Sequence, residues 1–190
     1  MDNTSPTTNA LPRRRFLRTV MGAALVVPAL GLPRVGHAYA GYGSVERLTF
    51  EHTHTGEALS LVYRVEGQYV PSALQSLNRF LRDFRTGDEH EIDPQLLDIL
   101  SRLAVITRSQ APFQVISAYR SPRTNAMLRE KSGGVAKGSL HLDGRAIDIR
   151  LPDVQLPDLR DAALSLRAGG VGFYPGPNFV HVDTGRVRTW

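Results

Sequence analysis

The stretch "SLHLDGRAIDIR" (residues 139–150) places a histidine and an aspartate seven positions apart around an Asp-Gly turn. After the turn, Asp148 stands between Ile147 and Ile149, in a run that reads as a central β-strand. A carboxylate between two isoleucines is costly to bury unless a cation compensates its charge. The segment therefore predicts a strand that carries Asp148 to a metal ion or to an arginine.

A second candidate histidine, His181, lies in the run "NFVHVDTG" farther along the chain. Side chains of a strand alternate between its two faces, so His181 and Asp183 are expected to be neighbours on one face. Two imidazoles and one carboxylate, with a fourth position left to water, are the ligand set of a catalytic zinc site. From spacing alone, a second arrangement stays open, in which Asp148 pairs with an arginine and His141 and His181 are unconnected.

The rest of the chain predicts helices beside a small, mainly antiparallel sheet, which is an α+β domain. In the second helix, apolar residues at helical spacing from Leu96 to Ile106 predict a buried stripe. The expected elements are a hairpin over 48–65, helices over 71–87 and from 94, a strand over 113–120, a helix over 121–134, a strand over 144–152, a helix over 156–170 and a hairpin over 171–187.

Other histidines and aromatic residues are expected to have structural roles. His52 and His54 lie two apart in the first hairpin, where a metal site is possible but exposed strand or turn positions are favoured. Tyr119, Tyr174 and Trp190 could line a groove for glycan or peptide stems, yet core positions are expected of aromatics in a domain of this size.

The N-terminus has the features of an export signal. Residues 12–40, "PRRRFLRTVMGAALVVPALGLPRVGHAYA", join a basic cluster, a short apolar stretch and an Ala-x-Ala site. The arginine pair followed by Phe16 and Leu17 resembles a twin-arginine signal, with Pro12 in place of the usual Ser or Thr and Arg18 in place of Lys. We therefore expect a signal over residues 1–40, a domain over 41–190, delivery by the twin-arginine export machinery to the periplasm or cell envelope, and no stable membrane anchor after cleavage.

Charge and cysteine content narrow the function further. The chain has 23 basic and 18 acidic residues, a net charge of +5, but residues 1–40 hold five arginines and one aspartate. The remaining 18 basic and 17 acidic residues nearly balance, so no nucleic-acid partner is expected. The chain has no cysteine, which excludes thiolate ligands and cysteine nucleophiles.

Two segments of the chain resemble a known family. The segment 117–152, with the motif S-x-H-x-x-G-x-A-x-D, and the segment 169–190 closely resemble YcbK-like murein endopeptidases, relatives of zinc D-Ala-D-Ala carboxypeptidases and of hedgehog and lysostaphin-type domains. The resemblance implies the hedgehog-like fold and one Zn²⁺ ion bound by His141, Asp148 and His181. It also implies that Arg120 steadies the scissile carbonyl or its oxyanion, and that Ser139 contacts the substrate.

One departure from the wider family concerns the general base. Distant relatives have a catalytic His two residues before the last ligand, or Glu or Asp three before it, where this chain has Phe179 and Asn178. Asp183 is then the nearest ionisable candidate for a catalytic base, with orientation of a ligand imidazole as the open alternative. The expected function is a zinc-dependent peptidase that cuts peptide cross-links or stem peptides of peptidoglycan. The alternative is a non-catalytic peptidoglycan-binding module.

Overall fold

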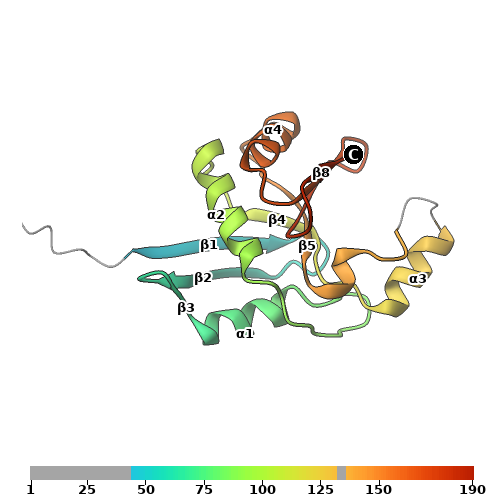
Figure 1. The fold of residues 1–190 in the computed structure, drawn as a ribbon. Coiled ribbons are helices and arrows are strands. Elements are labelled where there is room, and N and C mark those ends of the chain that lie inside the picture. The colour runs from blue at the N-terminus through green and yellow to red at the C-terminus, as the bar shows by residue number, and fades with distance from the viewer. Residues whose placement is uncertain (1–43, 132–135) are drawn as a thin grey trace, which may run out of the picture. The chain divides into compact units, whose positions relative to one another are not determined.

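A computed structural model describes residues 44–131 and 136–190, and the signal predicted for residues 1–40 lies outside them. The described part of the chain forms one eight-stranded sheet with four α-helices and a short 3-10 helix, η1 (Figure 1). The strands are β1 (Val45–His52), β2 (Ala58–Val65), β3 (Gln68–Tyr69), β4 (Phe113–Ser117), β5 (Ala146–Arg150), β6 (Gly170–Tyr174), β7 (Phe179–Asp183) and β8 (Arg188–Thr189). The helices are α1 (Pro71–Phe80), α2 (Gln95–Thr107), α3 (Pro122–Lys131), η1 (Leu140–Asp143) and α4 (Leu156–Leu166).

The sheet has the strand order β3-β2-β1-β4-β5-β7-β6-β8. Its neighbours are antiparallel except for the β1–β4 and β6–β8 pairs, so the expected mixed fold with a mainly antiparallel sheet is confirmed. The expectation of a small sheet is wrong. The N-terminal hairpin joins the C-terminal strands through the parallel β1–β4 pair, and two-residue strands extend both edges. Periodicity predicts single strands but carries no information about this long-range pairing.

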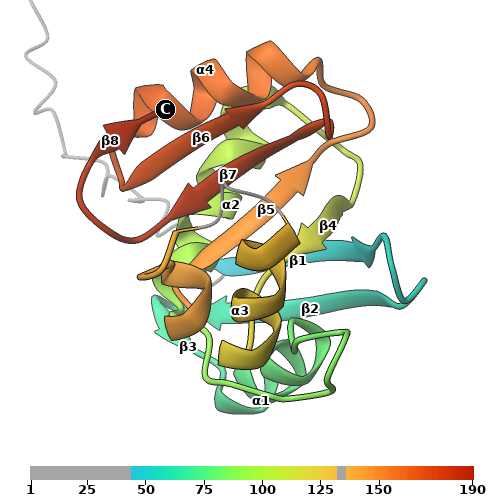
Figure 2. The same cartoon turned by 90° about the vertical axis from the view of Figure 1, so that its right-hand side faces the viewer.

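Two helices cover one face of the sheet. Figure 2 shows α2 and α4 behind the sheet, and α3 and η1 in front of it. The expected stripe of α2 is buried from Leu96 to Leu103, whereas Ile106, in the last turn, is 48% exposed and the prediction was wrong there. These leucines belong to the same hydrophobic core as the apolar side chains of β5 and β7.

The first helix ends earlier than predicted. It stops at Phe80, and the segment from there to α2 is a loop fixed by the buried carboxylate of Asp83. That carboxylate accepts hydrogen bonds from the Ser121 backbone N–H (2.9 Å) and hydroxyl (2.7 Å) and from the Arg85 N–H (2.9 Å). Burial raises the pKa of Asp83, but hydrogen bonds from Thr124 and Ser121 outweigh it, and the pKa lies below its usual value. Asp83 therefore ties this loop to the start of α3, next to Arg120.

The structure bears on membrane-spanning helices only in the residues that it describes. Over 44–131 and 136–190, no helix combines the length and apolar character that crossing a bilayer requires. The C-terminal end expected for α3 at Gly133 and Gly134 lies outside the described residues.

Candidate metal centre

Two of the predicted ligands lie opposite each other on neighbouring strands. In the antiparallel β5–β7 pair, Asp148 is in register with His181. Their neighbours Ile147 and Ile149 on β5 and Val180 on β7 belong to the core, so alternation turns Asp148 and His181 to the other face, where η1 lies (Figure 2). The sheet register alone brings the carboxylate and one imidazole together.

The third ligand is placed by η1. Ser139 caps its start, where the Ser139 hydroxyl accepts a hydrogen bond from the His141 N–H at 3.4 Å. Gly144 ends it in the left-handed conformation, with φ of 64°. The backbone N–H of Arg120 donates to the His141 carbonyl at 3.0 Å. The expected Asp-Gly turn is therefore the end of a 3-10 helix that is hydrogen-bonded to the segment after β4.

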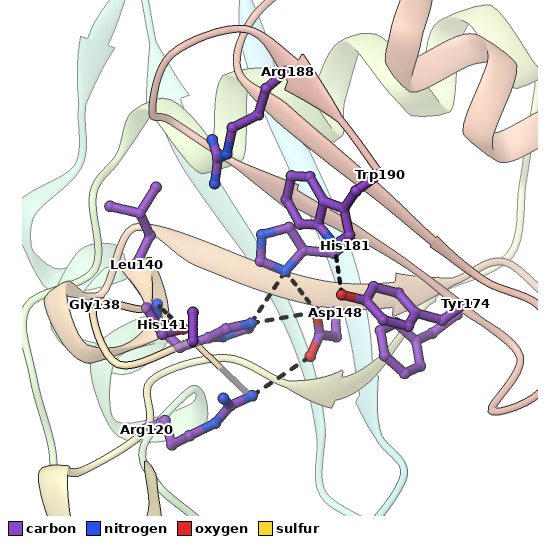
Figure 3. Close-up of a pocket in the computed structure, with 12 residues that line it drawn as sticks. Arg120, Gly138, Leu140, His141, Asp148, Tyr174, His181, Arg188 and Trp190 are labelled. Carbon is purple, nitrogen blue, oxygen red and sulfur yellow. Dashed lines mark hydrogen bonds and ion pairs between the residues drawn. The ribbon is translucent and has the colours of Figure 1, made fainter. Parts of the chain in front are cut away.

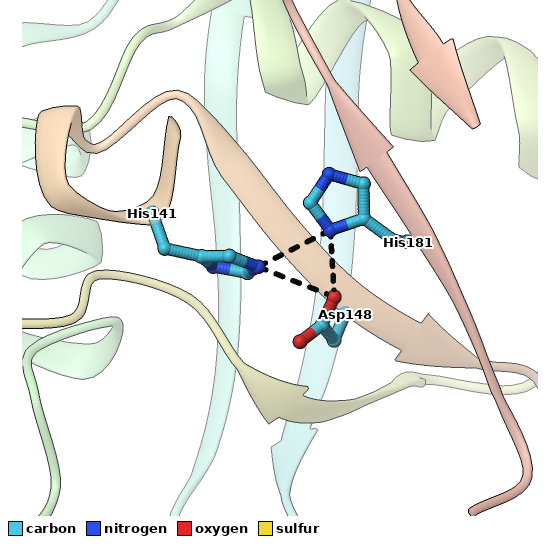
Figure 4. Close-up of side chains that lie close together, drawn as sticks. All are labelled: His141, Asp148 and His181. Atoms are coloured by element: carbon cyan, nitrogen blue, oxygen red, sulfur yellow. Dashed lines mark hydrogen bonds and ion pairs between the residues drawn. The ribbon is translucent and has the colours of Figure 1, made fainter. Parts of the chain in front are cut away.

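The three side chains converge, as Figure 4 shows. Nε2 of His141 lies 3.2 Å from Nδ1 of His181 and 3.3 Å from Oδ1 of Asp148, and Nδ1 of His181 lies 2.9 Å from the same oxygen. Ligand atoms around a tetrahedral zinc ion are about 3.3 Å apart, given metal–ligand distances of about 2.0–2.1 Å. The donor set and its spacing therefore fit one zinc ion.

Partners on the far side of each imidazole fix where its proton lies. Nδ1 of His141 lies 2.6 Å from the carbonyl oxygen of Ala118, which can only accept, so Nδ1 carries the proton and Nε2 has a free lone pair. Nε2 of His181 likewise donates to Oδ2 of Asp183 at 3.1 Å, which leaves Nδ1 of the neutral ring free. When His181 is neutral, three lone pairs face one another with no proton between them, and a cation would stabilise this arrangement.

The electrostatics of the cluster also favour a cation. Burial lowers the pKa of His181, but hydrogen bonds to Asp148 and Asp183 outweigh it and raise the pKa to about 8. Burial raises the pKa of Asp148, but His141 and His181 outweigh it, and the pKa lies well below its usual value. Asp148 is thus a buried anion, and the positive charges that can compensate it are a metal ion, a proton on His181 and the more distant guanidinium of Arg120.

Asp183 lies on the opposite side of the His181 ring from Asp148. Its carboxylate is fully buried and accepts hydrogen bonds from the Gly170 N–H (2.9 Å), the Gly185 N–H (2.8 Å) and the Arg188 guanidinium (2.7 Å) in addition to His181. Burial raises the pKa of Asp183, but these bonds outweigh it and lower the pKa well below its usual range. A carboxylate in this environment holds an imidazole in place, and it is a weak proton acceptor.

Arg120 approaches the cluster from the end of the segment after β4. The residue is 9% exposed, with one guanidinium nitrogen 3.9 Å from Oδ2 of Asp148 and another 3.4 Å from Oδ1 of Asn125. Its Nε has no hydrogen-bond partner among the described residues. Asp148 does lie near an arginine, but the two imidazoles meet at the same carboxylate, which excludes the arrangement with unconnected histidines.

A cleft of about 400 Å³ opens over this cluster (Figure 3). Ser139 lines it, as contact with a substrate requires. Tyr174 and Trp190 line it as well, and Trp190 is 49% exposed, so the expectation that these two belong to the core was wrong. Tyr119 is half-buried and stacks on His90 at 4.7 Å, centroid to centroid. The cleft is lined by Arg120, Ala136, Gly138, Ser139, Leu140, His141, Asp148, Tyr174, Phe179, His181, Arg188 and Trp190.

Sequence reasoning named Tyr174 and Trp190 as possible groove residues but favoured core positions for them, and it missed Arg188 on β8. On β6, Gly170, Gly172 and Tyr174 alternate along one strand, and this pattern was the available signal that a bare surface lies beside His181. A Cβ on Gly172 would lie 2.8 Å from the indole of Trp190, so only glycine allows that ring to rest there. The two-residue β8, which delivers Arg188 and Trp190, has no pattern that predicts it.

The other histidine pair does not form a metal site. His52 is 2% exposed and packs against Phe80 and Phe84, so the expectation of an exposed position was wrong for it. His54 is exposed and stacks on Phe84. Over the part of the chain that the structure covers, His141, Asp148 and His181 are the one group of three or more metal-ligating side chains placed to share an ion.

Comparisons with known proteins identify similar peptidoglycan peptidases. Residues 42–190 match the family model described as peptidoglycan L,D-endopeptidase MepK. The peptidoglycan L,D-endopeptidase MepK of Escherichia coli strain K12 is 43% identical over 93% of this chain and 96% of its own length. The probable peptidoglycan L,D-endopeptidase MepK of Haemophilus influenzae is 45% identical over 75% of this chain and 77% of its own length.

Proposed function

The chain belongs to the peptidoglycan L,D-endopeptidase MepK family, the YcbK-like murein endopeptidases, and from this membership we propose that it is an exported zinc-dependent peptidase acting on peptidoglycan. Its substrate would be the peptide cross-links or stem peptides. The observation that carries the proposal is the convergence of three metal-binding atoms at the bottom of a cleft. Family membership supports a peptidoglycan peptidase, and the donor set supports zinc.

The metal would be held by Nε2 of His141, the carboxylate of Asp148 and Nδ1 of His181, because these atoms have free lone pairs directed at a common point. A zinc ion bound there would act as a Lewis acid toward the scissile carbonyl and would make a water molecule acidic near neutral pH. The protein contributes the fixed orientation of the two imidazoles, through Ala118 and Asp183.

The remaining site residues have distinct proposed roles. The buried guanidinium of Arg120 would stabilise the negative charge that develops on the carbonyl oxygen. Ser139, on the rim of the cleft, would contact the peptide. For Asp183 we favour the orienting role over that of general base, because its oxygens are occupied and buried, and it faces the nitrogen of His181 that is turned away from the cluster.

The domain plan and location complete the proposal. Residues 1–40 would be a twin-arginine signal and residues 41–190 a peptidase domain with the fold of hedgehog and D-Ala-D-Ala peptidase domains. The protein would act in the periplasm or cell envelope, with the twin-arginine export machinery and peptidoglycan as its partners.

The set of residues lining the cleft is also compatible with a second function, binding of peptidoglycan without hydrolysis. With Asp183 occupied and with Phe179 and Asn178 at the positions where distant relatives carry a base, the cleft has no obvious proton acceptor beyond the proposed ligands. A module that binds peptidoglycan without cutting it would satisfy the same geometry.

One assay separates the two functions. The purified protein is incubated with cross-linked sacculi with zinc or with a chelator, and the released muropeptides are separated by chromatography. The peptidase proposal predicts loss of cross-linked species with zinc, none with chelator, and none for His141→Ala. His54→Ala, an exposed histidine outside the cleft, is the matched control and should retain activity. Retained binding with an unchanged muropeptide profile would establish the binding module instead.

A further inference from the structure

The wall of the cleft beside His181 is aromatic and is built on β6 and β8. Trp190 donates a hydrogen bond from Nε1 to the hydroxyl of Tyr174 at 2.6 Å. The Trp190 ring lies over Gly172, with its centroid 5.2 Å from that of His181. Gly172 is the register partner of His181, so the indole borders the ligand imidazole directly. Tyr174 and Trp190 are therefore held next to the cluster by the same strand pairing that positions His181.

The direction of this hydrogen bond determines what the Tyr174 hydroxyl can do. An indole N–H can only donate, so the tyrosine oxygen must accept in this pair. The hydroxyl proton of Tyr174 is then left for another acceptor. Because Tyr174 lines the cleft, that acceptor can be a group of a bound peptide.

Several contacts fix the ring that carries this hydroxyl. Tyr174 stacks on Phe179, its register partner on β7, at 4.6 Å between centroids and 22° between planes. The Arg188 guanidinium lies over the Trp190 ring at 4.8 Å and is itself bound to Asp183. The hydroxyl thus has a fixed position, as a preorganised donor requires.

Few other groups lining the cleft can donate to a substrate oxygen. Beyond the three proposed ligands, the side-chain donors of the lining are Arg120, Ser139, Tyr174, Arg188 and Trp190. Arg188 is bound to Asp183 and Trp190 to Tyr174. Ser139, whose oxygen accepts from the His141 N–H, keeps its hydroxyl proton for the substrate contact proposed above. Arg120 and Tyr174 are the other two available donors, and Figure 3 shows them reaching the cluster from different sides.

We propose that Tyr174 is a catalytic residue whose hydroxyl donates a hydrogen bond to the oxygen of the scissile carbonyl as negative charge develops on it, together with Arg120. Trp190 is the positioning residue, since its N–H occupies the tyrosine oxygen and directs the hydroxyl proton into the cleft. This inference rests on the proposed peptidase function and adds a second donor to it.

The test uses a soluble cross-linked muropeptide, zinc-loaded protein and three variants, with kcat and KM measured separately. Tyr174→Phe keeps the ring and removes the hydroxyl, so kcat should fall on the order of 100-fold while KM changes less than about twofold. Trp190→Phe keeps an aromatic ring and removes the N–H, so kcat should fall roughly tenfold through misdirection of the hydroxyl. Tyr119→Phe, a half-buried tyrosine stacked on His90, is the matched control and should leave both constants unchanged.

A double-mutant cycle separates positioning from packing. If Trp190 acts through Tyr174, Trp190→Phe should have no further effect on kcat in the Tyr174→Phe background. Equal losses in both backgrounds would overturn the positioning role. A Tyr174→Phe enzyme with kcat within twofold of wild type, or with a changed KM alone, would overturn the catalytic role.

A readout without catalysis checks the hydrogen bond itself. Trp190 is the single tryptophan of the chain, so its fluorescence reports on this wall. In metal-free protein, Tyr174→Phe should shift the emission of Trp190 because the indole N–H loses its acceptor, and unchanged emission would overturn the proposed pairing. Inactive wild-type protein would count against the peptidase function, whereas active wild type with an equally active Tyr174→Phe variant would count against Tyr174 alone.

Discussion

At the scale of single residues, Asp183 shows how an imidazole is prepared for a metal ion. Its carboxylate holds the proton of His181 on Nε2 and leaves Nδ1 free to bind. In Asp183→Asn, an amide N–H₂ can face Nε2 and force the proton onto Nδ1, the proposed ligand atom. Zinc affinity should therefore fall by about 10- to 100-fold, as measured by competition with a chromophoric chelator.

The control for this variant is Asp153→Asn, which alters an exposed carboxylate that accepts hydrogen bonds from Ser109 and Gln110 away from the cleft. It should leave zinc affinity unchanged. If Asp183→Asn bound zinc as tightly as wild type and lost only hydrolysis, Asp183 would be a general base and the orienting role would be wrong.

His52 provides a pH-dependent contribution to stability. Burial, followed by the neighbouring His54, lowers the pKa of His52 to about 4, against an ordinary value of 6.5. Below pH 6.5 the unfolded chain binds a proton that the folded protein refuses, so the folded state loses stability as the pH falls from about 6.5 to about 4. Urea unfolding of metal-free protein should show a steeper loss between pH 7 and pH 5 in wild type than in His52→Gln. Parallel pH profiles of the two proteins would show that His52 is not the group responsible.

At the scale of elements, the 3-10 helix η1 depends on the glycine that ends it. Gly144 has φ of 64°, and a Cβ there would lie 2.1 Å from the carbonyl oxygen of Glu91. Gly87 has φ of 80° but nothing within 4 Å of its would-be Cβ, so it is a matched control for the backbone effect alone. We expect Gly87→Ala to cost about 1 kcal/mol of unfolding free energy and Gly144→Ala about 1–3 kcal/mol more.

The functional consequence should differ between these two variants as well. Gly144→Ala should also weaken zinc binding, because His141 lies on the helix that the added methyl group displaces. Calorimetric zinc titration of both variants checks this. Equal unfolding free energies, or unimpaired zinc binding in Gly144→Ala, would show that the turn does not place His141.

The elements also show which parts of the site the sequence could predict. The family resemblance carried by the motif around His141 and Asp148 implied three ligands that the structure brings together, whereas spacing and strand alternation alone left that cluster as one of two possibilities. A groove position was considered for Tyr174 and Trp190 but core positions were favoured, because Trp190 reaches the cleft after β8, a two-residue strand whose pairing with β6 the sequence does not predict. The burial predicted for Ile106 was wrong for a related reason. The apolar periodicity continues to the end of the helix, but the other elements that pack against the helix do not extend that far.

At the scale of the whole molecule, the sheet joins an N-terminal hairpin to the site-bearing strands through the β1–β4 pair. Local sequence patterns predicted the N-terminal hairpin and the C-terminal strands separately but not the pairing that joins them in one sheet. The sheet is therefore larger than expected. The core is formed by the sheet with α1, α2 and α4, and the cleft opens on the face opposite to α2 and α4 (Figures 1 and 2). The strand register and η1 thus determine where the three proposed ligand residues lie.

The export route is tested on the full chain in cells. Replacement of Arg13 and Arg14 by lysine removes the arginine pair while keeping the charge. We expect the unprocessed precursor to accumulate in the cytoplasm, as shown by fractionation and immunoblotting. Normal processing of the double variant would point to another arginine pair or to the general secretory route.

The central claim is that one zinc ion is bound by His141, Asp148 and His181. Zinc-edge anomalous diffraction from crystals of the protein tests it most directly, because it locates the metal and its ligand atoms together. The account predicts one zinc ion per chain, with Nε2 of His141 and Nδ1 of His181 at about 2.0–2.1 Å and a carboxylate oxygen of Asp148 at about 2.0–2.2 Å. A zinc-soaked crystal without an anomalous peak between these side chains, with Asp148 paired to Arg120 instead, would contradict it.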